Sequence, residues 1–227
     1  MPDRRPRLRR SEDVPADALI LYSAVVTDPS TTAVSAIVTR IRRLLDQGTA
    51  PVLVALDGHS CAGKSWLAPD VAAEVDGVVV DGDDFYAGDP ASAWDARTVV
   101  DDAERCIDWR RLRHEALEPL LARSAASWHP YDWDAGGGLV PAPTIRQPAA
   151  VVILDGVYSA RAELADLVTL SVLVEAPAAI RRARMARRDG RIDAWHERWD
   201  AAERHYLTQV RPPGSFDLVV ANADPPD

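Results

Sequence analysis

An eight-residue segment, GHSCAGKS, constrains the fold of this chain more than any other feature. It runs from Gly58 to Ser65, follows the short apolar run VLVAL, and precedes an apolar pattern of helical spacing at Leu67, Val71 and Val75. The glycines permit backbone conformations and close approaches that a side chain would block. Consecutive N–H groups and the start of the next helix would surround a polyphosphate with positive potential. Strand, loop and helix together predict a phosphate-binding loop of the GxxxxGK[ST] type.

Lysine occurs once in this chain, at position 64, although lysine and arginine together number 26. We expect its ammonium group to meet the β- and γ-phosphates of a nucleotide, and the Ser65 hydroxyl to bind Mg²⁺. ATP and Mg²⁺ are therefore the expected cofactors, although the sequence does not separate ATP from GTP. The expected nucleotide-binding residues are Gly58, His59, Ser60, Cys61, Ala62, Gly63, Lys64, Ser65 and Trp66.

Composition narrows the classes of function. A net charge of -9 argues against a nucleic-acid polymer as partner, because phosphate backbones require a basic surface. No apolar run approaches the roughly 18 residues of a membrane span, and the Arg-rich start lacks the apolar segment of a secretory signal. Two cysteines, Cys61 and Cys106, make no disulfide framework. We therefore expect a cytoplasmic protein with no membrane partner.

The rest of the chain alternates short apolar runs with helical patterns. We expect a flexible arm over residues 1–18 and one P-loop domain over 19–227. Strands are expected at 52–56, 78–80, 149–154, 168–174 and 217–220, and helices at 31–47, after Asp108, after Pro177 and at 194–209. This order predicts a three-layer α/β P-loop NTPase fold with a mainly parallel sheet and a small lid. Residues 124–148, rich in Gly, Pro and Trp, are expected to form a functional loop or a hairpin insertion.

Carboxylates follow two of the expected strands. Asp155 ends one strand and precedes Gly156, as an acid that holds Mg²⁺ would. Asp81, Asp83 and Asp84 follow another strand. Adjacent carboxylates raise one another's pKa, which suits a proton acceptor or a metal site. An ordinary turn aspartate and a solvated acidic turn are the respective alternatives.

The segment RRARMARRDGR holds six arginines in a chain of negative net charge. On a helix, Arg184, Arg187, Arg188 and Arg191 would share one broad face. Guanidinium groups pair with phosphate oxygens through two hydrogen bonds, so such a face suits a clamp on a moving phosphoryl group. The alternative is a solvated helix, and the phosphate-binding loop favours the clamp.

Five segments together resemble the uridine kinase family, P-loop kinases related to phosphoribulokinase and pantothenate kinase. They are VALDGHSCAGKS, VVVDGDDFY, YDWD, VVILDGVYS and RARMARRDGR, in order between about Pro51 and Asn222. The loop alone is generic, whereas DDFY is much more specific. The resemblance implies an enzyme that moves the γ-phosphoryl group of ATP to a hydroxyl of a small molecule.

The resemblance also implies roles for individual residues. Asp83 stands where the family has the aspartate that takes the proton from the substrate hydroxyl, beside the metal, and Tyr86 follows it on the substrate side. Asp155 replaces the usual glutamate that assists Mg²⁺. Arg187 and Arg188 are the expected catalytic arginines of the lid, and Arg184 is expected to contact the substrate.

Two further substrate contacts follow from the resemblance. Tyr131 stands where the family places a tyrosine against the nucleobase, and Asp102 aligns on loose spacing with a sugar-binding aspartate. The family's base-recognising histidine is absent, with Gly136 or its neighbours in its place. Because Trp128 and Trp133 lie nearby, we expect a pocket that depends on stacking and shape.

The acceptor remains the most open expectation. A nucleoside such as uridine or cytidine is the leading acceptor, used poorly and with weak discrimination. The alternatives are a non-nucleoside alcohol, or a nucleotide-binding regulator that hydrolyses ATP slowly. The sequence leaves the oligomeric state open, with a homo-oligomer among the choices.

Overall fold

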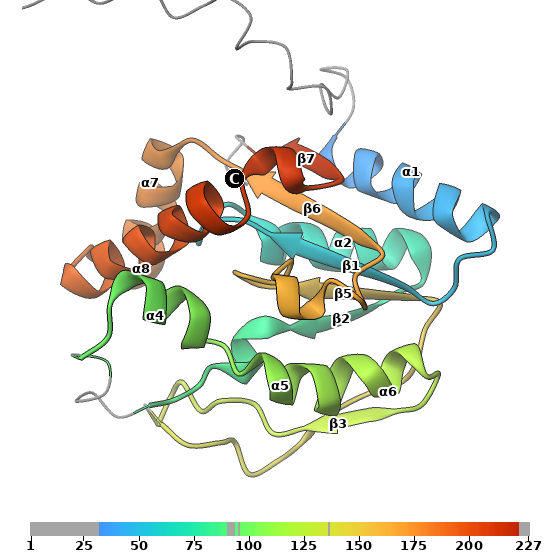
Figure 1. The fold of residues 1–227 in the computed structure, drawn as a ribbon, viewed down its shortest axis with the longest axis horizontal. Coiled ribbons are helices and arrows are strands. Elements are labelled where there is room, and N and C mark those ends of the chain that lie inside the picture. Colours follow the sequence, from blue (N-terminus) through green and yellow to red (C-terminus); the bar gives the residue numbers. More distant parts are fainter. Residues whose placement is uncertain (1–31, 90–93, 95, 136, 223–227) are drawn as a thin grey trace, which may run out of the picture.

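The computed structural model describes residues 32–89, 94, 96–135 and 137–222, so the expected arm at 1–18 lies outside the described residues. The centre is a five-stranded parallel sheet in the order β2–β5–β1–β6–β7 (Figure 1). These strands are β1 (Val52–Asp57), β2 (Val78–Asp81), β5 (Val151–Asp155), β6 (Leu170–Glu175) and β7 (Leu218–Ala221). The expected mainly parallel sheet is confirmed.

Successive side chains of the central strand enter two different cores, as the period of a strand requires. Leu53 and Ala55 pack into one core, whereas Val54 and Leu56 pack into the other. Helices α1 (Ala33–Asp46) and α2 (Lys64–Val75) cover one face of the sheet. Helices α5 (Trp109–Arg111), α6 (Glu118–Leu121) and α8 (Ala194–His205) lie over the other face. These three layers confirm the α/β class.

The remaining helices are short or interrupted. Helix α4 (Val99–Arg105) precedes α5, which runs into α6 through a π-helical stretch, Leu112–Leu117. Helix α7 (Ala178–Asp189) carries the arginine-rich segment, and α8 continues into a second π-helical stretch, Tyr206–Val210. Short 3₁₀ turns lie at Gly82–Phe85, Ala162–Leu164 and Pro213–Ser215.

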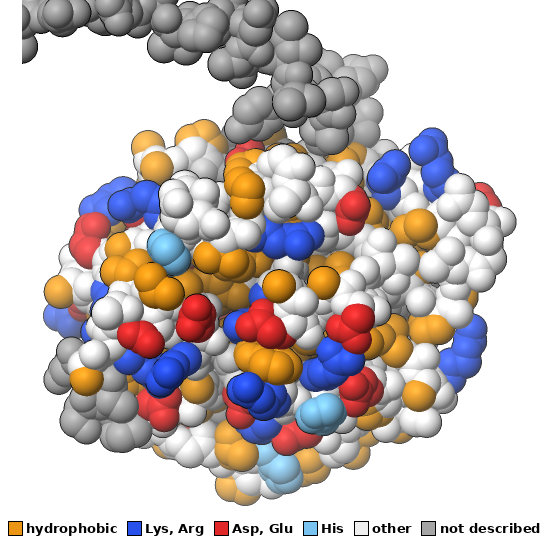
Figure 2. Space-filling view, viewed as in Figure 1, with side chains coloured by type: hydrophobic (Ala, Val, Ile, Leu, Met, Phe, Trp, Pro, Cys, Tyr) orange, Lys and Arg blue, Asp and Glu red, His pale blue; other side chains and the backbone are white. Residues whose placement is uncertain are grey.

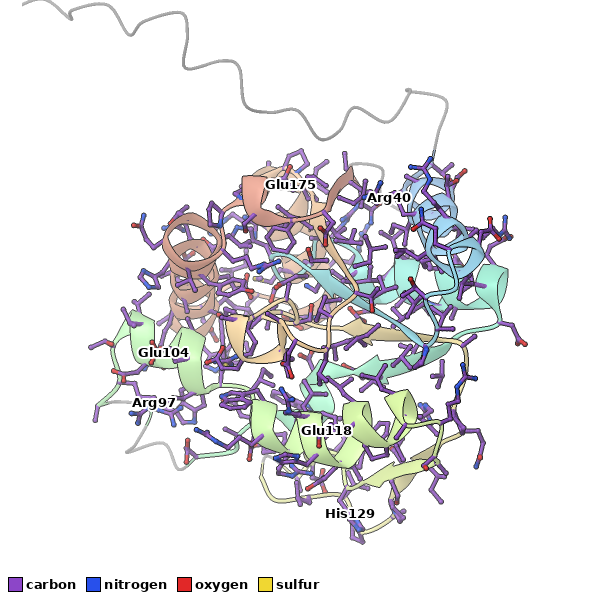
Figure 3. The ribbon with its side chains drawn as sticks, turned by 45° about the vertical axis from the view of Figure 1, so that its right-hand side comes forward. Arg40, Arg97, Glu104, Glu118, His129 and Glu175 are labelled. Carbon is purple, nitrogen blue, oxygen red and sulfur yellow. The ribbon has the colours of Figure 1, made fainter. Side chains whose placement is uncertain are left out.

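The segment after α6 contains a hairpin. Strands β3 (Ala126–Trp128) and β4 (Thr144–Arg146) pair antiparallel as a sheet of their own. Figure 3 shows this segment, with His129, below the helix that carries Glu118. Trp128 packs against Phe85, and its Nε1 donates a hydrogen bond to Asp84 at 2.7 Å. The expectation that Trp128 belongs to the acceptor pocket is therefore wrong, because its ring is buried in the core.

Parallel strands bring their carboxyl ends to one edge of the sheet, where ligands bind in open α/β folds. Here β1 ends at Asp57, β2 at Asp81 and β5 at Asp155. Asp81 lies opposite Asp155 in the register of β2 and β5. The sheet therefore gathers the carboxylates that the sequence places far apart.

On the face shown in Figure 2, basic and acidic side chains are interleaved. Arg113 pairs with Asp166 and Glu118, and Arg111 pairs with Glu115. These carboxylates offset the positive charge of the arginines on the helical segment from α5 to α6. Among the described helices, none is long and apolar enough to cross a membrane.

Candidate active site

The loop after β1 depends on two glycines. Gly58 has a φ of 136°, and a Cβ there would lie 2.3 Å from the carbonyl oxygen of Val174. Gly63 has a φ of 102°, and a Cβ there would lie 1.9 Å from Nδ2 of Asn222. A side chain at either position would displace a neighbouring strand or the residue after β7. Gly63 leads directly into α2, so the loop ends at a helix N-terminus, which favours anions.

Lys64 is buried inside this loop. Its Nζ donates hydrogen bonds to the carbonyl oxygens of Gly58 at 2.9 Å and His59 at 3.0 Å. The ammonium group is thus held beside the loop backbone by neutral acceptors. A bound phosphate would offer it stronger, charge-assisted hydrogen bonds.

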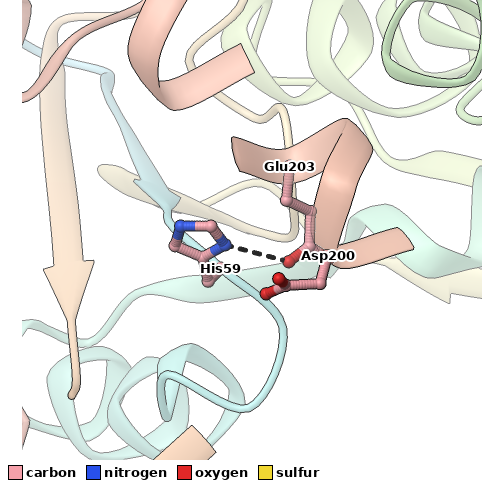
Figure 4. Close-up of side chains that lie close together, drawn as sticks. All are labelled: His59, Asp200 and Glu203. Atoms are coloured by element: carbon pink, nitrogen blue, oxygen red, sulfur yellow. Dashed lines mark hydrogen bonds and ion pairs between the residues drawn. The ribbon is translucent and has the colours of Figure 1, made fainter. Parts of the chain in front are cut away.

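Glu203 of α8 anchors the outer side of the loop (Figure 4). Its Oε2 accepts a hydrogen bond from the Ser60 N–H at 2.9 Å and lies 3.2 Å from His59 Nδ1, while Oε1 accepts one from the Ser60 hydroxyl. His59, Asp200 and Glu203 place potential metal-binding atoms within 4.8 Å of one another. Asp200, however, pairs with Arg181 and Arg204. The cluster therefore ties the loop to α8 through contacts within the protein.

Asp57 secures the start of the loop. Its carboxylate accepts hydrogen bonds from the N–H groups of Gly58 at 2.7 Å, Tyr158 at 3.0 Å and Ala160 at 2.9 Å, and from the Tyr206 hydroxyl at 2.8 Å. Burial raises the pKa of Asp57, and the hydrogen bonds from backbone and tyrosine oppose that rise. This buried carboxylate joins the loop to the segment after β5 and to the end of α8.

The carboxylates at the sheet edge hold their protons more tightly than ordinary aspartates. Burial raises the pKa of Asp81 to about 6, and the charge of Asp83 adds to the rise. Burial also raises the pKa of Asp83 and of Asp155, while Lys64 lowers both. A carboxylate with a raised pKa and access to a cleft is suited to accept a proton.

Asp155 also provides an oxygen that the protein leaves unused. Its Oδ1 is buried and has no hydrogen-bond partner among the described residues. A hydrogen bond from Ser65 lowers the pKa of the same carboxyl group. A buried carboxylate oxygen beside a serine hydroxyl is a donor set that suits a hard cation such as Mg²⁺. Ser65 and Asp155 therefore fit the expected metal.

Two pockets open beside the loop, and we call them the loop pocket and the aromatic pocket. The loop pocket has a volume of about 340 Å³ and is lined by Cys61, Gly63, Lys64, Ser65, Trp66, Arg184, Arg187, Arg188 and Asn222. The aromatic pocket, of about 690 Å³, includes Ser60, Asp83, Tyr86, Trp133, Arg188, Trp195, Trp199 and Glu203 in its lining. Arg188 lines both pockets and therefore stands where they adjoin.

The arginines of α7 divide between these pockets. Arg184 donates hydrogen bonds to the carbonyl oxygens of Cys61 at 3.1 Å, Ala62 at 3.2 Å and Asn222 at 3.1 Å. It therefore supports the loop pocket, away from the acceptor side where the sequence led us to expect it. Arg187 lines the loop pocket as well. Arg188 makes two hydrogen bonds of 2.8 Å to Asp189.

Tyr86 is the centre of an aromatic cluster. Its ring stacks on Trp94 with centroids 5.4 Å apart, and it meets Trp133 at 4.7 Å and Tyr131 at 4.8 Å. Tyr86 and Trp133 line the aromatic pocket, whereas Tyr131 packs against both of them without being part of its lining. The structure thus places Tyr131 beside the aromatic pocket, behind the two residues that line it.

Asp102 lies in neither pocket. This buried residue of α4 receives hydrogen bonds from Nε and Nη2 of Arg198 on α8, the latter at 2.9 Å. Its carboxylate is fully engaged in an ion pair that joins the two helices. The expected sugar contact is therefore replaced by a structural contact.

Three residues of the site received no role from the sequence. Asp57 was visible as a carboxylate that ends a buried strand just before the loop. In the sequence, Glu203 is one of several acidic residues on an expected helix, and Asn222 is a polar residue after the last expected strand. Their functions depend on which loop atoms lie beside them in space, which residue spacing does not reveal.

Comparisons with known proteins support the fold. No family model matches this chain, and no curated protein matches its sequence. A structure of a candidate fructose transport system kinase from Silicibacter sp. TM1040 is 22% identical, with 83% of this chain and 98% of that chain covered and a TM-score of 0.66. A possible uridine kinase from Bacillus stearothermophilus is 17% identical, with 82% and 99% covered and a TM-score of 0.60.

The chain shares the fold of uridine kinase-like P-loop kinases. This likeness confirms the resemblance and the fold class that the sequence predicted. At these identities the likeness establishes the fold alone, and the chemistry must be argued from the site of this chain.

Proposed function

We propose that this protein is a kinase that transfers the γ-phosphoryl group of ATP to a hydroxyl of a small molecule. The observation that carries the proposal is the position of Arg188, between the phosphate-binding loop and the pocket of Asp83. Phosphoryl transfer requires donor and acceptor on opposite sides of the moving group, with positive charge beside it. Two adjoining pockets with a shared arginine meet that requirement.

The loop pocket would hold the nucleotide. Lys64, Arg187 and Arg188 would stabilise charge on the phosphates, and the exposed ring of Trp66 offers a surface for the rest of the nucleotide. Ser65, Asp155 and Asp83 would hold Mg²⁺, which when bound neutralises phosphate charge. Arg184 and Glu203 keep the loop in shape.

Asp83 would act on the acceptor. Its carboxylate takes the proton of the acceptor hydroxyl, and the oxygen forms a bond to the γ-phosphorus. The bond from that phosphorus to the bridging oxygen breaks, and the electron pair leaves with ADP. The raised pKa of Asp83 makes its ionised form a better proton acceptor than an ordinary aspartate.

The acceptor is proposed as a nucleoside such as uridine or cytidine, with a non-nucleoside alcohol as the alternative. The alternative is supported by the absence of the family's base-recognising histidine from the sequence. A slow ATP-hydrolysing regulator is the alternative outside kinases, but such a protein needs no base for a hydroxyl.

The test is ADP release from ATP, measured with and without nucleosides, sugars and cofactor precursors. The proposal predicts release that depends on at least one acceptor and appears together with a phosphorylated product. Release that proceeds equally without any acceptor would instead support the regulator.

A further inference from the structure

We infer that the acceptor carries a positive charge near its hydroxyl, as an ammonium group of an amino alcohol or amino sugar. This inference rests on the proposed kinase function, and within it favours a cationic form of the non-nucleoside alcohol over the neutral nucleoside. It is drawn from the charge and the aromatic surface of the aromatic pocket, neither of which the phosphoryl transfer itself requires.

The charge of the aromatic pocket is strongly negative. Its described lining contains two arginines, Arg188 and Arg191, and six carboxylates: Asp81, Asp83, Asp84, Asp189, Asp193 and Glu203. Both arginines are already paired within the pocket, Arg188 with Asp189 and Arg191 with Asp193. Within the described part of the chain, the other four carboxylates form no ion pair with lysine or arginine. Six carboxylates against two arginines leave the lining with a negative surplus, which Lys64 near Asp83 and the arginines Arg111 and Arg146 near Asp84 reduce.

This surplus discriminates among acceptors. Asp81, Asp83 and Asp84 lie close together at the end of β2 and line the same pocket, so the region already disfavours further negative charge. ATP in the adjoining loop pocket would add more. An acceptor with a phosphate or carboxylate group would be repelled, whereas an ammonium group would relieve the repulsion.

Aromatic rings form the other part of the lining. Trp133, from the segment before β4, is 50% exposed, and Trp195 of α8 is 49% exposed. Tyr86 and Trp199 also line the pocket. The electron-rich face of an indole ring attracts cations, by about 0.5–2 kcal/mol. This chain uses the same attraction nearby, where the guanidinium of Arg97, labelled in Figure 3, lies 4.2 Å from the centre of the Trp94 ring.

Rings and carboxylates together select for an amine more sharply than either does alone. Neutral sugars also stack on indole rings, but they gain nothing from the surplus of carboxylates over cations in the lining. A neutral nucleoside likewise leaves the negative charge unopposed. The ammonium group satisfies both features at once.

The experiment compares acceptors of matched shape and different charge. Choline is compared with 3,3-dimethylbutan-1-ol, its uncharged isostere, and glucosamine with glucose and glucuronate; uridine and fructose are included. We expect kcat/KM to favour the cationic member of each pair by at least about tenfold, which corresponds to the strength of a single cation–π contact. Glucuronate is expected to be the poorest hexose acceptor.

Tryptophan variants provide the matched control. Trp133→Leu and Trp195→Leu should raise KM for the cationic acceptor by about tenfold, and leave KM for ATP and for the neutral isostere nearly unchanged. Trp66 is 59% exposed but lines the loop pocket, so Trp66→Leu should raise KM for ATP and spare the cationic acceptor. All three rings are exposed, so their loss should not unfold the protein.

The outcomes separate the inference from the proposed function. Neutral or anionic acceptors used as well as their cationic partners would overturn the inference and leave the kinase proposal intact. No acceptor-dependent ADP release with any compound would overturn the kinase proposal. In that case the cation site is tested by tryptophan fluorescence of the protein, titrated without ATP with choline and with its uncharged isostere. Stronger quenching by choline would support the cation site, and equal quenching would overturn it.

Discussion

At the scale of single residues, Lys64 and Asp83 carry opposite charges into two adjoining pockets. Lys64 is held by two backbone carbonyl oxygens, so its charge is positioned before any phosphate binds. Burial raises the pKa of Asp83, and the charge of Asp155 adds to the rise, so its carboxylate is more basic than an ordinary aspartate. Preorganised charge of this kind is effective because it needs no rearrangement during the reaction.

Replacement of Lys64 tests the loop pocket. Lys64→Ala removes the ammonium group, and we expect turnover to fall at least about 100-fold, the usual effect of losing one such electrostatic contact. The fold should persist, because Lys64 bonds only to the loop carbonyls. Turnover is measured by ADP release, and folding by circular dichroism. Near-normal turnover would contradict a role of the loop in phosphoryl transfer.

Conservative substitutions distinguish the roles of Arg187 and Arg188 on α7. Lysine keeps the charge of Arg188 but loses the planar group that meets two oxygens at once. Arg188→Lys should lower kcat by about tenfold or more with little change in ATP affinity, because Arg188 lines both pockets. Arg187→Lys should also lower kcat more than it weakens ATP binding, but to a smaller extent. Unchanged kcat in both variants would make α7 an ordinary surface helix.

Residue positions were predictable from the sequence where a motif defines them. The sole lysine in a glycine-flanked loop and the aspartates after strands both follow from pattern and spacing. Glu203 and Asp57 were not predictable, because a carboxylate that anchors a loop acts through backbone N–H groups, and every sequence carries those.

At the scale of elements, α8 supports the loop from outside. Glu203→Ala should raise KM for ATP by about tenfold, since a misplaced phosphate-binding group typically costs that much or more. Glu203→Gln keeps the shape and should retain most of the affinity. Asp200→Asn is the control, because Asp200 lies one turn away and its hydrogen bonds among the described residues go to Arg181 and Arg204 and not to the loop. Equal KM values in Glu203→Ala and the control would leave Glu203 without a positioning role.

The ion pair between α4 and α8 makes a different prediction. Asp102→Ala leaves the Arg198 guanidinium without its carboxylate, and we expect the free energy of unfolding to fall by about 3 kcal/mol. Glu104→Ala, on the exposed side of the same helix, should change it by less than about 0.5 kcal/mol. Urea unfolding measures both. Unchanged stability with lost acceptor affinity would restore Asp102 as a substrate contact.

Helix α4 shows why some elements could not be predicted from the sequence. It exposes Val99 and Val100 and buries Asp102 and Ala103, so its apolar residues do not mark its buried face. Its start is fixed by a capping box between Thr98 and Asp101. Strands buried on both faces have no such ambiguity, and all five strands of the sheet lie close to their predicted positions.

At the scale of the whole molecule, the parallel sheet brings together the carboxylates of the candidate active site. It brings the ends of β1, β2 and β5 to one edge and thereby crowds Asp81, Asp83 and Asp155. The fold class followed from alternating strands and helices. Tyr86 and Trp133 were expected on the acceptor side, whereas Trp195 and Trp199 were not, because they come from a distant helix whose proximity only the folded chain defines.

The raised pKa of Asp83 predicts how activity depends on pH. The proton acceptor must be ionised, and a raised pKa means that Asp83 keeps its proton to a higher pH than an ordinary aspartate. As the pH falls, acceptor-dependent kcat/KM should therefore decline at a pH above the usual aspartate pKa of about 4. Asp81, with its pKa of about 6, loses its negative charge as the pH falls through that value. A profile that stays flat down to about pH 4 would contradict a raised pKa at the base.

The most direct test of the kinase proposal is acceptor-dependent ADP release by Asp83→Asn beside calorimetric titration with ATP. The amide keeps the shape of the side chain and removes the base, so release should fall at least about 100-fold while ATP affinity stays nearly unchanged. Asp84→Asn is the matched control and should be milder, because Asp84 accepts a hydrogen bond from the buried Trp128 and asparagine retains an acceptor oxygen. Near-normal release by Asp83→Asn, or a complete loss confined to Asp84→Asn, would contradict the assignment of Asp83 as the base.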